Sequence, residues 1–185
     1  MKTSDERWLA RYYFSRASFS VLWVGLALSL GQQHAGLGAA LLLIYPLWDA
    51  VANAADASRN GGFGRNRTQT INLAVSLATT LAVAATLPVG LGSVLAVFGA
   101  WAILSGILQL STALRRWRVA GAQWAMVLSG AQSALAGAFF IVQAQQAVPA
   151  VLPTIAGYAG FGALYFAISG ISLALRGRSQ QQSAA

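Results

Sequence analysis

The sequence predicts an all-α membrane protein with six transmembrane helices, arranged as three parallel helical-hairpin repeats. Three observations lead to this fold class: an apolar composition, a clustering of the basic residues and an internal repeat. Of the 185 residues, 57% are hydrophobic and only 9% are charged, whereas soluble domains carry about 25% charged residues. A helix needs roughly 20 apolar residues to cross a bilayer core about 30 Å thick. The chain therefore has room for six such helices and short loops.

The basic residues divide the apolar sequence into three blocks. All 12 Lys and Arg residues fall into four short clusters, at 2–16, 59–67, 115–118 and 176–178. Each block between successive clusters is long enough for two crossings, and the turn in its middle carries no Lys or Arg. Because cytoplasmic loops keep an excess of Lys and Arg, we expect both termini in the cytoplasm. The expected location is the cytoplasmic (inner) membrane of a bacterium.

Residues 1–16 are expected to form an amphipathic segment at the membrane interface, leading into the first span. The segment mixes Arg7, Arg11 and Arg16 with aromatic residues, and both kinds of side chain suit the headgroup layer. The transmembrane domain then covers 17–176, with hairpins at about 17–56, 71–114 and 119–175. Its spans are predicted at about 17–30, 39–56, 71–87, 92–114, 119–142 and 151–175. Residues 177–185 are a polar cytoplasmic tail, expected to lack regular structure.

The hairpins share a repeated motif. The second helix of each of the last two hairpins has an aromatic residue four positions before a Ser-Gly pair: Trp101 before Ser105 and Gly106, and Tyr165 before Ser169 and Gly170. In the second span Trp48 aligns with these aromatic residues, but Asn53 takes the place of the glycine. Each hairpin begins and ends on the inside. The repeats are therefore parallel and related by an axis near the membrane normal.

Small residues predict where the helices touch. The fifth span carries Ser129, Ser133 and Gly137 at intervals of four residues, which places them on one face. Lipid supplies no hydrophobic drive between helices, so faces of small residues that allow close backbone approach hold a bundle together. We expect these residues and the two Ser-Gly pairs to serve helix packing.

One polar stripe stands out in the second span. Asp49, Asn53 and Asp56 are spaced by four and three, so they share one helical face, and the stripe holds two of the four acidic residues. Asp56 should lie near the inner surface, with Asp49 about 10 Å deeper at 1.5 Å per residue. An unpaired charge at the centre of a membrane helix costs roughly 2.5–3.5 kcal/mol. Asp49 must therefore face the bundle, find a partner or hold a proton.

Two interpretations of this stripe are open. In the structural one, Asp56 pairs with Arg59 one turn away, and Asp49 is held by Asn53 or by a polar group of the third span, such as Asn72, Ser76 or Thr79. In the functional one, the stripe is a cation- or proton-binding site that opens inwards, with Asp49 titrating and Asn53 as a neutral ligand. Intramembrane acids are functional candidates by default.

No catalytic, metal or cofactor site is expected elsewhere. The chain has no cysteine, and its single histidine, His34, falls in the first outer turn, at the opposite end from the acidic stripe. A zinc site needs several His or Cys ligands. The glycine-rich turn at 60–65 lacks the strand, lysine and hydroxyl of a phosphate-binding loop. The net charge of +8 is explained by topology and does not indicate nucleic acid. Contact with anionic lipid headgroups is instead expected from the arginines of the inner turns: Arg65, Arg67, Arg115, Arg116 and Arg118.

The hairpin repeat resembles the HdeD-like acid-resistance membrane proteins, which share a short repeat domain of unknown function. The similarity is best over residues 92–176, on the Ser-Gly-Ile triplets at 105–107 and 169–171 and on the segments 98–101 and 129–131. The resemblance implies a six-helix inner-membrane protein, linked in some members to survival under acid stress, with no catalytic residues to carry over. The segment 45–49 departs from the simpler repeat.

Three functions of different classes follow. The first is a non-enzymatic integral membrane protein of the envelope or acid stress response, acting through packing, homo-oligomerisation or a partner. The second is a small proton or cation channel or carrier that uses the Asp49 stripe. The third, a membrane enzyme acting on lipid, ranks last because no nucleophile and base are placed on one side.

Overall fold

Six long helices make up the described part of the molecule. The computed structural model describes the backbone of residues 2–118, 123–146 and 150–182, and the side chains of 5–118, 123–146 and 150–176. The long helices are α1 (Lys2–Leu28), α3 (Ala35–Arg59), α4 (Arg67–Thr86), α5 (Leu91–Arg116), α6 (Gln123–Gln143) and α7 (Val151–Gln182), and the short α2 (Leu30–Gln33) follows α1. Six of these segments are long and apolar enough to cross a membrane, which confirms the predicted fold class. The predicted start of the fifth span, at 119, lies outside the described residues.

The long helices close into a ring. Each one contacts the next, and α7 returns to α1. The most extensive interfaces join α3 to α4, α5 to α6 and α7 to α1, so each joins the second helix of one hairpin to the first helix of the next. Contacts between neighbouring hairpins are therefore more extensive than contacts between the two helices of one hairpin.

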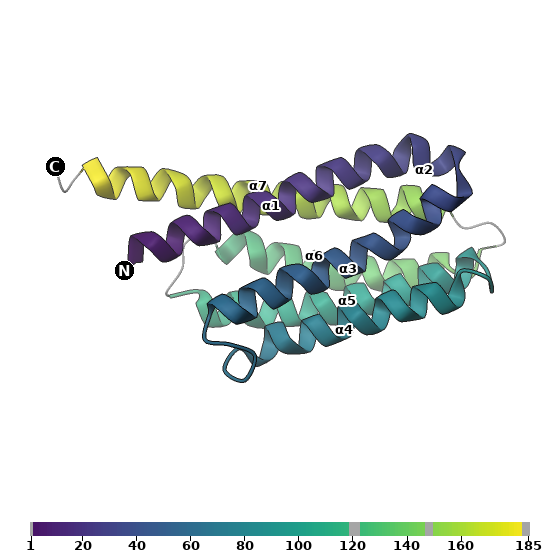
Figure 1. The fold of residues 1–185 in the computed structure, drawn as a ribbon, viewed down its shortest axis with the longest axis horizontal. Coiled ribbons are helices and arrows are strands. Elements are labelled where there is room, and N and C mark those ends of the chain that lie inside the picture. Colours follow the sequence, from purple (N-terminus) through teal and green to yellow (C-terminus); the bar gives the residue numbers. More distant parts are fainter. Residues whose placement is uncertain (1, 119–122, 147–149, 183–185) are drawn as a thin grey trace.

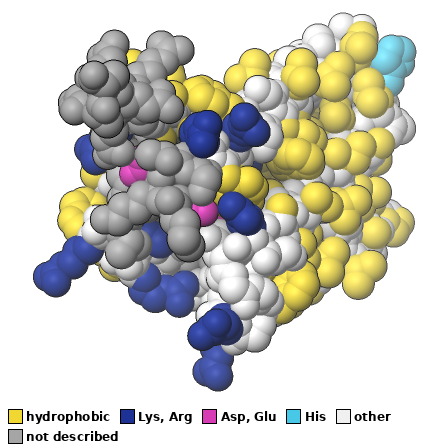
Figure 2. Space-filling model, turned by 60° about the vertical axis from the view of Figure 1, so that its left-hand side comes forward, with side chains coloured by type: hydrophobic (Ala, Val, Ile, Leu, Met, Phe, Trp, Pro, Cys, Tyr) yellow, Lys and Arg dark blue, Asp and Glu magenta, His cyan; other side chains and the backbone are white. Residues whose placement is uncertain are grey.

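The two ends of the bundle differ in charge. Figure 1 shows both termini and the α3–α4 turn at one end, with α2 and the α4–α5 turn at the other. Lys and Arg side chains gather towards the first end, and the histidine lies at the opposite edge of the face shown in Figure 2. We call these the arginine-rich end and the His34 end. The arrangement follows the predicted charge pattern.

Glycines set the closeness of α5 and α6. A Cβ atom added to Gly99 would lie 2.7 Å from the carbonyl oxygen of Gly137, and one added to Gly106 would lie 2.6 Å from that of Gly130. Such distances leave no room for a side chain, so the two backbones touch directly, as small-residue interfaces in membranes allow. The predicted packing role of Gly106 and Gly137 is therefore visible here, and Gly99 and Gly130 complete the interface.

The repeated glycine of α7 packs differently. A Cβ atom on Gly170 would meet the ring of Phe14 at 3.2 Å, and the neighbouring Ser169 is fully buried. This position thus faces α1, in the same way that Gly106 faces α6. The repeat motif therefore marks the interfaces between hairpins.

The structure adds detail at both ends of the chain. Residues 1–16 were expected to form an interfacial segment that leads into the first span; α1 is continuous through them, and Leu9 and Tyr13 are buried with Phe166 and Leu173 of α7. The tail was expected to lack regular structure, but the backbone of α7 stays helical to Gln182. The packing of α1 against α7 accounts for the continuous helix at the start of the chain (Figure 1).

Apolar and polar residues occupy different halves of the interior. The half towards the His34 end is filled by fully buried large side chains, including Trp23, Val83, Leu95, Phe98 and Ile155. Buried polar side chains concentrate in the other half and near the middle: Asp49, Asn53, Asp56, Gln69, Asn72, Ser76, Ser105, Thr112 and Gln123. This division positions the candidate site.

Candidate functional site

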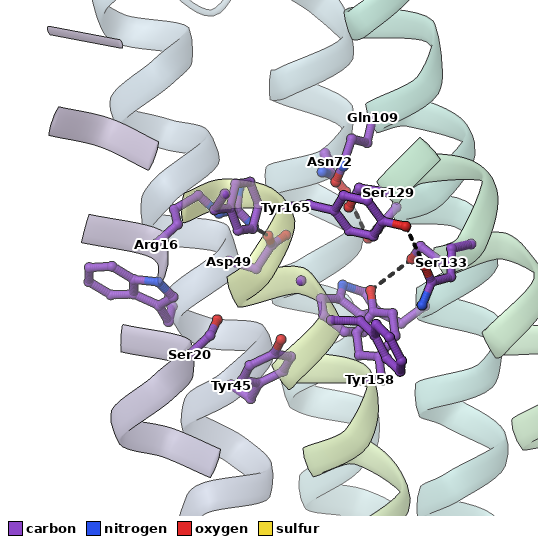
Figure 3. A pocket seen from close by; sticks show the side chains of 17 residues that line it. Arg16, Ser20, Tyr45, Asp49, Asn72, Gln109, Ser129, Ser133, Tyr158 and Tyr165 are labelled. Atoms are coloured by element: carbon purple, nitrogen blue, oxygen red, sulfur yellow. Dashed lines mark hydrogen bonds and ion pairs between the residues drawn. The ribbon is translucent and has the colours of Figure 1, made fainter. Parts of the chain in front are cut away.

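The site is centred where Arg16 of α1 meets Asp49 of α3 inside the bundle. A guanidinium nitrogen of Arg16 donates to a carboxylate oxygen of Asp49, and Figure 3 shows the two side chains pointing towards each other. The side chain of Arg16 is 15% exposed and that of Asp49 is 8% exposed, so the ion pair is largely buried. Arg16 also donates to the Tyr12 hydroxyl at 3.1 Å and lies 4.4 Å from the centre of the Phe166 ring. The second contact is a cation–π interaction.

The sequence interpretation placed Arg16 in the headgroup layer, and the structure places it in the core. Seven of the described residues of α1 are buried and recur at intervals of three and four: Leu9, Ala10, Tyr13, Ala17, Ser20, Trp23 and Ala27. Arg16 lies next to Ala17, three residues after Tyr13 and four before Ser20, and therefore beside this buried face. That spacing is the signal that could have assigned Arg16 to the bundle interior.

Two neutral donors complete the surroundings of the Asp49 carboxylate. Asn53, one turn further along α3, donates to Oδ2 at 2.9 Å, and Ser76 of α4 donates to the same oxygen at 2.8 Å. Both partners were among those predicted for Asp49. The Ser76 hydroxyl in turn accepts the indole N–H of Trp101 at 3.0 Å, so α5 also takes part. Thr79, a third predicted partner, instead donates to the Val75 carbonyl of its own helix at 2.8 Å.

Asp56 has a different arginine from the one predicted. Arg116, at the end of α5, lies 3.0 Å from its carboxylate, whereas Arg59 forms an exposed pair with Asp5 at 3.4 Å. Asp56 is only 1% exposed, and its carboxylate faces α4 and α5. Arg59 is half-exposed and reaches the exposed Asp5, whereas Arg116 reaches the buried carboxylate of Asp56 from the end of α5. Asp56 also accepts hydrogen bonds from Asn60 and, at 2.8 Å, from Gln69.

Amides and hydroxyls extend the hydrogen bonding of each acid to neighbouring helices. Asn72 of α4 donates to the Asn53 side-chain oxygen at 3.3 Å and accepts from Ser105 of α5 at 2.9 Å. Near Asp56, Thr112 of α5 donates to Gln69 at 3.0 Å. Together with Ser76 and Trp101, these groups form two hydrogen-bonded clusters, one at each acid. We call the two clusters together the polar network of α3, α4 and α5. The predicted Asp49, Asn53 and Asp56 stripe is therefore its α3 side.

Two small cavities adjoin this network. The first is lined by Arg16, Asp49 and a set of aromatic and polar side chains from every long helix, shown in Figure 3. The second lies towards the arginine-rich end and is lined by Asp56, Gln69, Thr112, Arg116 and Gln123, among others. Each cavity has about 40 Å³ of room for the centres of water molecules. Four residues line both cavities, so they adjoin directly: Arg16, Asn72, Gln109 and Phe166.

Hydroxyl groups cover the side of the first cavity opposite Asp49. Ser133 of α6 donates to the Ala102 carbonyl at 2.9 Å and lies 2.7 Å from the Tyr158 hydroxyl. Tyr165 donates to Gln132 at 2.8 Å, and Ser129 also lines the cavity. The serines predicted for packing on span five thus face the polar interior, while Gly137 meets α5.

The arginines predicted to contact lipid divide into two groups. Arg65, Arg67, Arg115 and Arg118 are exposed at the arginine-rich end. Arg116 instead turns inwards, with its side chain 19% exposed and paired with Asp56. Its predicted headgroup contact is therefore replaced by a buried ion pair. The physical reason is the unscreened carboxylate of Asp56 one helix away, which attracts a guanidinium more strongly than a solvated surface does.

The arrangement neutralises its own charges. Each buried acid is within contact of one arginine, and the remaining lone pairs of both carboxylates accept from neutral donors. In the part of the chain that the structure describes, no three His, Cys, Asp or Glu side chains come close enough to hold a metal ion. His34 is exposed at the far end of the bundle. What the site can do is bind water and hold four helices together: α1, α3, α4 and α5.

The fold and the site define a class: a multi-pass α-helical membrane protein with an ion-paired polar core. Comparison of the chain with protein-family models, curated proteins and solved structures finds no match in any of the three. The function must therefore be argued from the residues themselves.

Proposed function

We propose that the chain is a non-enzymatic integral membrane protein of the HdeD-like kind, acting in the envelope or acid stress response of a bacterium. The sequence support is the hairpin repeat with its Ser-Gly pairs. The structural support is that these pairs lie at interfaces between hairpins, where Gly106 meets α6 and Gly170 meets α1. A repeat whose shared residues serve packing is typical of a protein that works as a bundle and not as a catalyst.

One observation carries the proposal: both buried acids are fixed in ion pairs with arginines from other helices. Asp49 is held by α1 and Asp56 by α5. A carboxylate that is already paired and hydrogen-bonded is a poor general base and a good cross-link, because removing its partner costs about 3–5 kcal/mol. The polar core therefore suits a structural or binding role.

Survival under stress tests this function. Deleting the gene in its native bacterium should lower survival after an acid or envelope challenge, and the wild-type gene should restore it. An Arg16→Met variant should fail to restore survival, while Arg59→Gln, which removes only an exposed pair, should restore it. If the deleted strain survives every such challenge as well as its parent, the proposed stress function is wrong.

We further propose that the arginine-rich end faces the cytoplasm of a bacterium and contacts anionic lipid. This orientation follows the positive-inside rule, and each surface arginine near an anionic leaflet contributes about 1 kcal/mol to the attraction. A reporter active only in the cytoplasm, fused after residue 185, should be active. Native mass spectrometry from nanodiscs should detect bound anionic lipid and would also report any association of copies.

A second candidate function, a proton or cation carrier or channel, is favoured by the cavity beside Asp49. The carboxylate lines a space that can hold water in the middle of the bundle. Within this candidate a proton suits the site better than a metal cation, because the guanidinium of Arg16 already occupies the carboxylate. Protein in liposomes with a pH-sensitive dye inside should pass protons, and Asp49→Asn should abolish the flux. Asp5→Asn, a change at the exposed acid, is the matched control.

A further inference from the structure

We infer that Asp49 exchanges protons with water through the arginine-rich end alone, along the two adjoining cavities, and is sealed from the His34 end. The inference rests on the second function proposed above, and it makes this structure a state open to one side. It therefore favours a carrier, which must change shape to complete a cycle, over a continuous channel.

The path begins at the polar end of the bundle. The second cavity lies among Asp56, Arg116, Thr112 and Gln123, close to the ends of α3 and α5 and the start of α6. Its lining supplies hydrogen-bond donors and acceptors from five helices, which buried water needs. The cavity lies towards the arginine-rich end, beside Arg116, whose side chain is 19% exposed.

The two cavities meet at a shared wall. Arg16, Asn72, Gln109 and Phe166 line both, and three of these four side chains are polar. Gln109 donates to the Met126 carbonyl at 3.3 Å, and its side-chain oxygen can accept a hydrogen bond from water. Water in the second cavity is thus separated from the Asp49 cavity by three polar side chains and the Phe166 ring.

The coordination that each species requires bears on which one moves. Each cavity has about 40 Å³ of room for the centres of water molecules, so both can hold water. A hard cation such as Ca²⁺ takes six to eight oxygen ligands, whereas a proton needs a single carboxylate oxygen. The Asp49 carboxylate is already shared with Arg16, so the site favours a proton.

Beyond Asp49 the path is closed by two layers of aromatic rings. Tyr45, Trp101 and Tyr158 line the first cavity, and each is backed by a second ring further towards the His34 end. The backing contacts, measured between ring centres, are Trp23–Tyr45 at 4.7 Å, Phe98–Trp101 at 5.9 Å and Phe140–Tyr158 at 5.8 Å. Trp23, Phe98 and Phe140 are at most 3% exposed.

A third cavity near the His34 end does not breach this barrier. Its lining is mostly apolar, with Leu42, Leu91 and Leu152 among its residues, and it shares none with the two polar cavities. Such a space offers few partners for water. The closed side of Asp49 is therefore apolar from the aromatic rings outwards.

The groups that govern the Asp49 proton come from several helices. Arg16 of α1 holds the charged form, while α4 and α5 present the neutral Ser76 and Trp101. The other titratable neighbours around the first cavity are the phenols of Tyr45, Tyr158 and Tyr165. When a proton passes from water to the Asp49 carboxylate, the carboxyl becomes neutral and Arg16 keeps its charge. The guanidinium then loses its countercharge and retains the Tyr12 hydroxyl and the Phe166 ring.

Hydroxyl-radical labelling by brief X-ray irradiation of the intact protein in nanodiscs tests the water path, because radicals form where water is. Phe166 lines both cavities and Phe140 lies in the backing layer, and the two are 8% and 3% exposed. Since they are the same residue type with similar burial, they form a matched pair. We expect oxidation of Phe166 and of Met126, and none of Phe140 or Phe98. Equal labelling of Phe166 and Phe140, or no labelling of Phe166, overturns the inference.

Infrared difference spectroscopy tests the proton. Acidifying the wild-type protein should produce the C=O band of a protonated carboxyl that is absent in Asp49→Asn and unchanged in Asp5→Asn. A band that persists in Asp49→Asn overturns the assignment. The liposome flux measurement decides the carrier function by itself. A one-sided water path without proton flux would therefore refute the carrier function alone. Proton flux without a one-sided path would refute this inference alone.

Discussion

Replacing Arg16 by methionine should destabilise the bundle more than any surface substitution, and the structure sets the size of the loss. Methionine keeps most of the length of the side chain and removes its charge. The Asp49 carboxylate would keep two hydrogen bonds, from Asn53 and Ser76, but no countercharge. Removing one member of a buried ion pair costs about 3–5 kcal/mol. Because the pair adjoins a cavity that can hold water, we expect a loss at the lower end, about 3 kcal/mol.

A double-mutant cycle isolates the pair. In Asp49→Asn the side-chain oxygen can still accept from both neutral donors, so Arg16→Met combined with Asp49→Asn should recover most of the loss. The coupling energy should be about 2 kcal/mol, within the range for residues in contact. Unfolding in mixed micelles with increasing SDS, followed by circular dichroism, measures each free energy. If Arg16→Met lies within about 0.5 kcal/mol of the wild type, or if the two changes simply add, the pair does not stabilise the fold.

Three further outcomes are expected. Gly137→Ala should lower the free energy of unfolding by about 1–3 kcal/mol through overpacking, because the added Cβ would lie 2.4 Å from the Gly99 carbonyl oxygen. Gly157→Ala, whose Cβ would meet nothing within 4 Å, should be neutral in the same unfolding assay. Arg116→Gln should destabilise the protein by about 3 kcal/mol because it leaves the buried Asp56 unpaired. Arg59→Gln should change stability by less than about 1 kcal/mol because it breaks only an exposed pair. Equal effects of the two changes would contradict the assigned partners. The exposed arginines are Arg65, Arg67, Arg115 and Arg118. Replacing them with glutamine should weaken binding to anionic vesicles by about 1 kcal/mol per charge, measured by cosedimentation at fixed salt. An unchanged affinity would exclude them as lipid contacts.

The sequence predicted the fold from the distribution of charge, which is a property of the whole chain. The partners of individual charges depend on which helices become neighbours in the ring, and spacing along one helix does not contain that information. Arg59 is three residues from Asp56 and pairs elsewhere, whereas Arg116 is distant in sequence and adjacent in space. Residue spacing along one helix can predict ion pairs only between residues of that helix.

Of the partners of Asp49, the sequence predicted Ser76 but not Arg16. Ser76 could be chosen because depth in the membrane follows from residue count along each span, and α3 and α4 are joined by a short turn. Arg16 could not be chosen on the same grounds, because aromatic and basic neighbours gave it an interfacial appearance. The three- and four-residue spacing of the buried positions on α1 indicates that Arg16 lies in the interior, but the basic and aromatic composition of the same segment indicates the membrane interface.

The return of α7 to α1 has a consequence for biosynthesis and for protein engineering. The first helix leaves the ribosome before the other long helices, yet its main partner, α7, follows all of them, so the ring stays open until α7 has been made. The two ends of the chain finish at the same end of the bundle. A circular permutant with a short linker between the natural ends and new ends in the turn at 60–66 should therefore insert and fold, because both termini stay at the arginine-rich end and every helix pair is kept. In that permutant α1 would directly follow α7 in the chain.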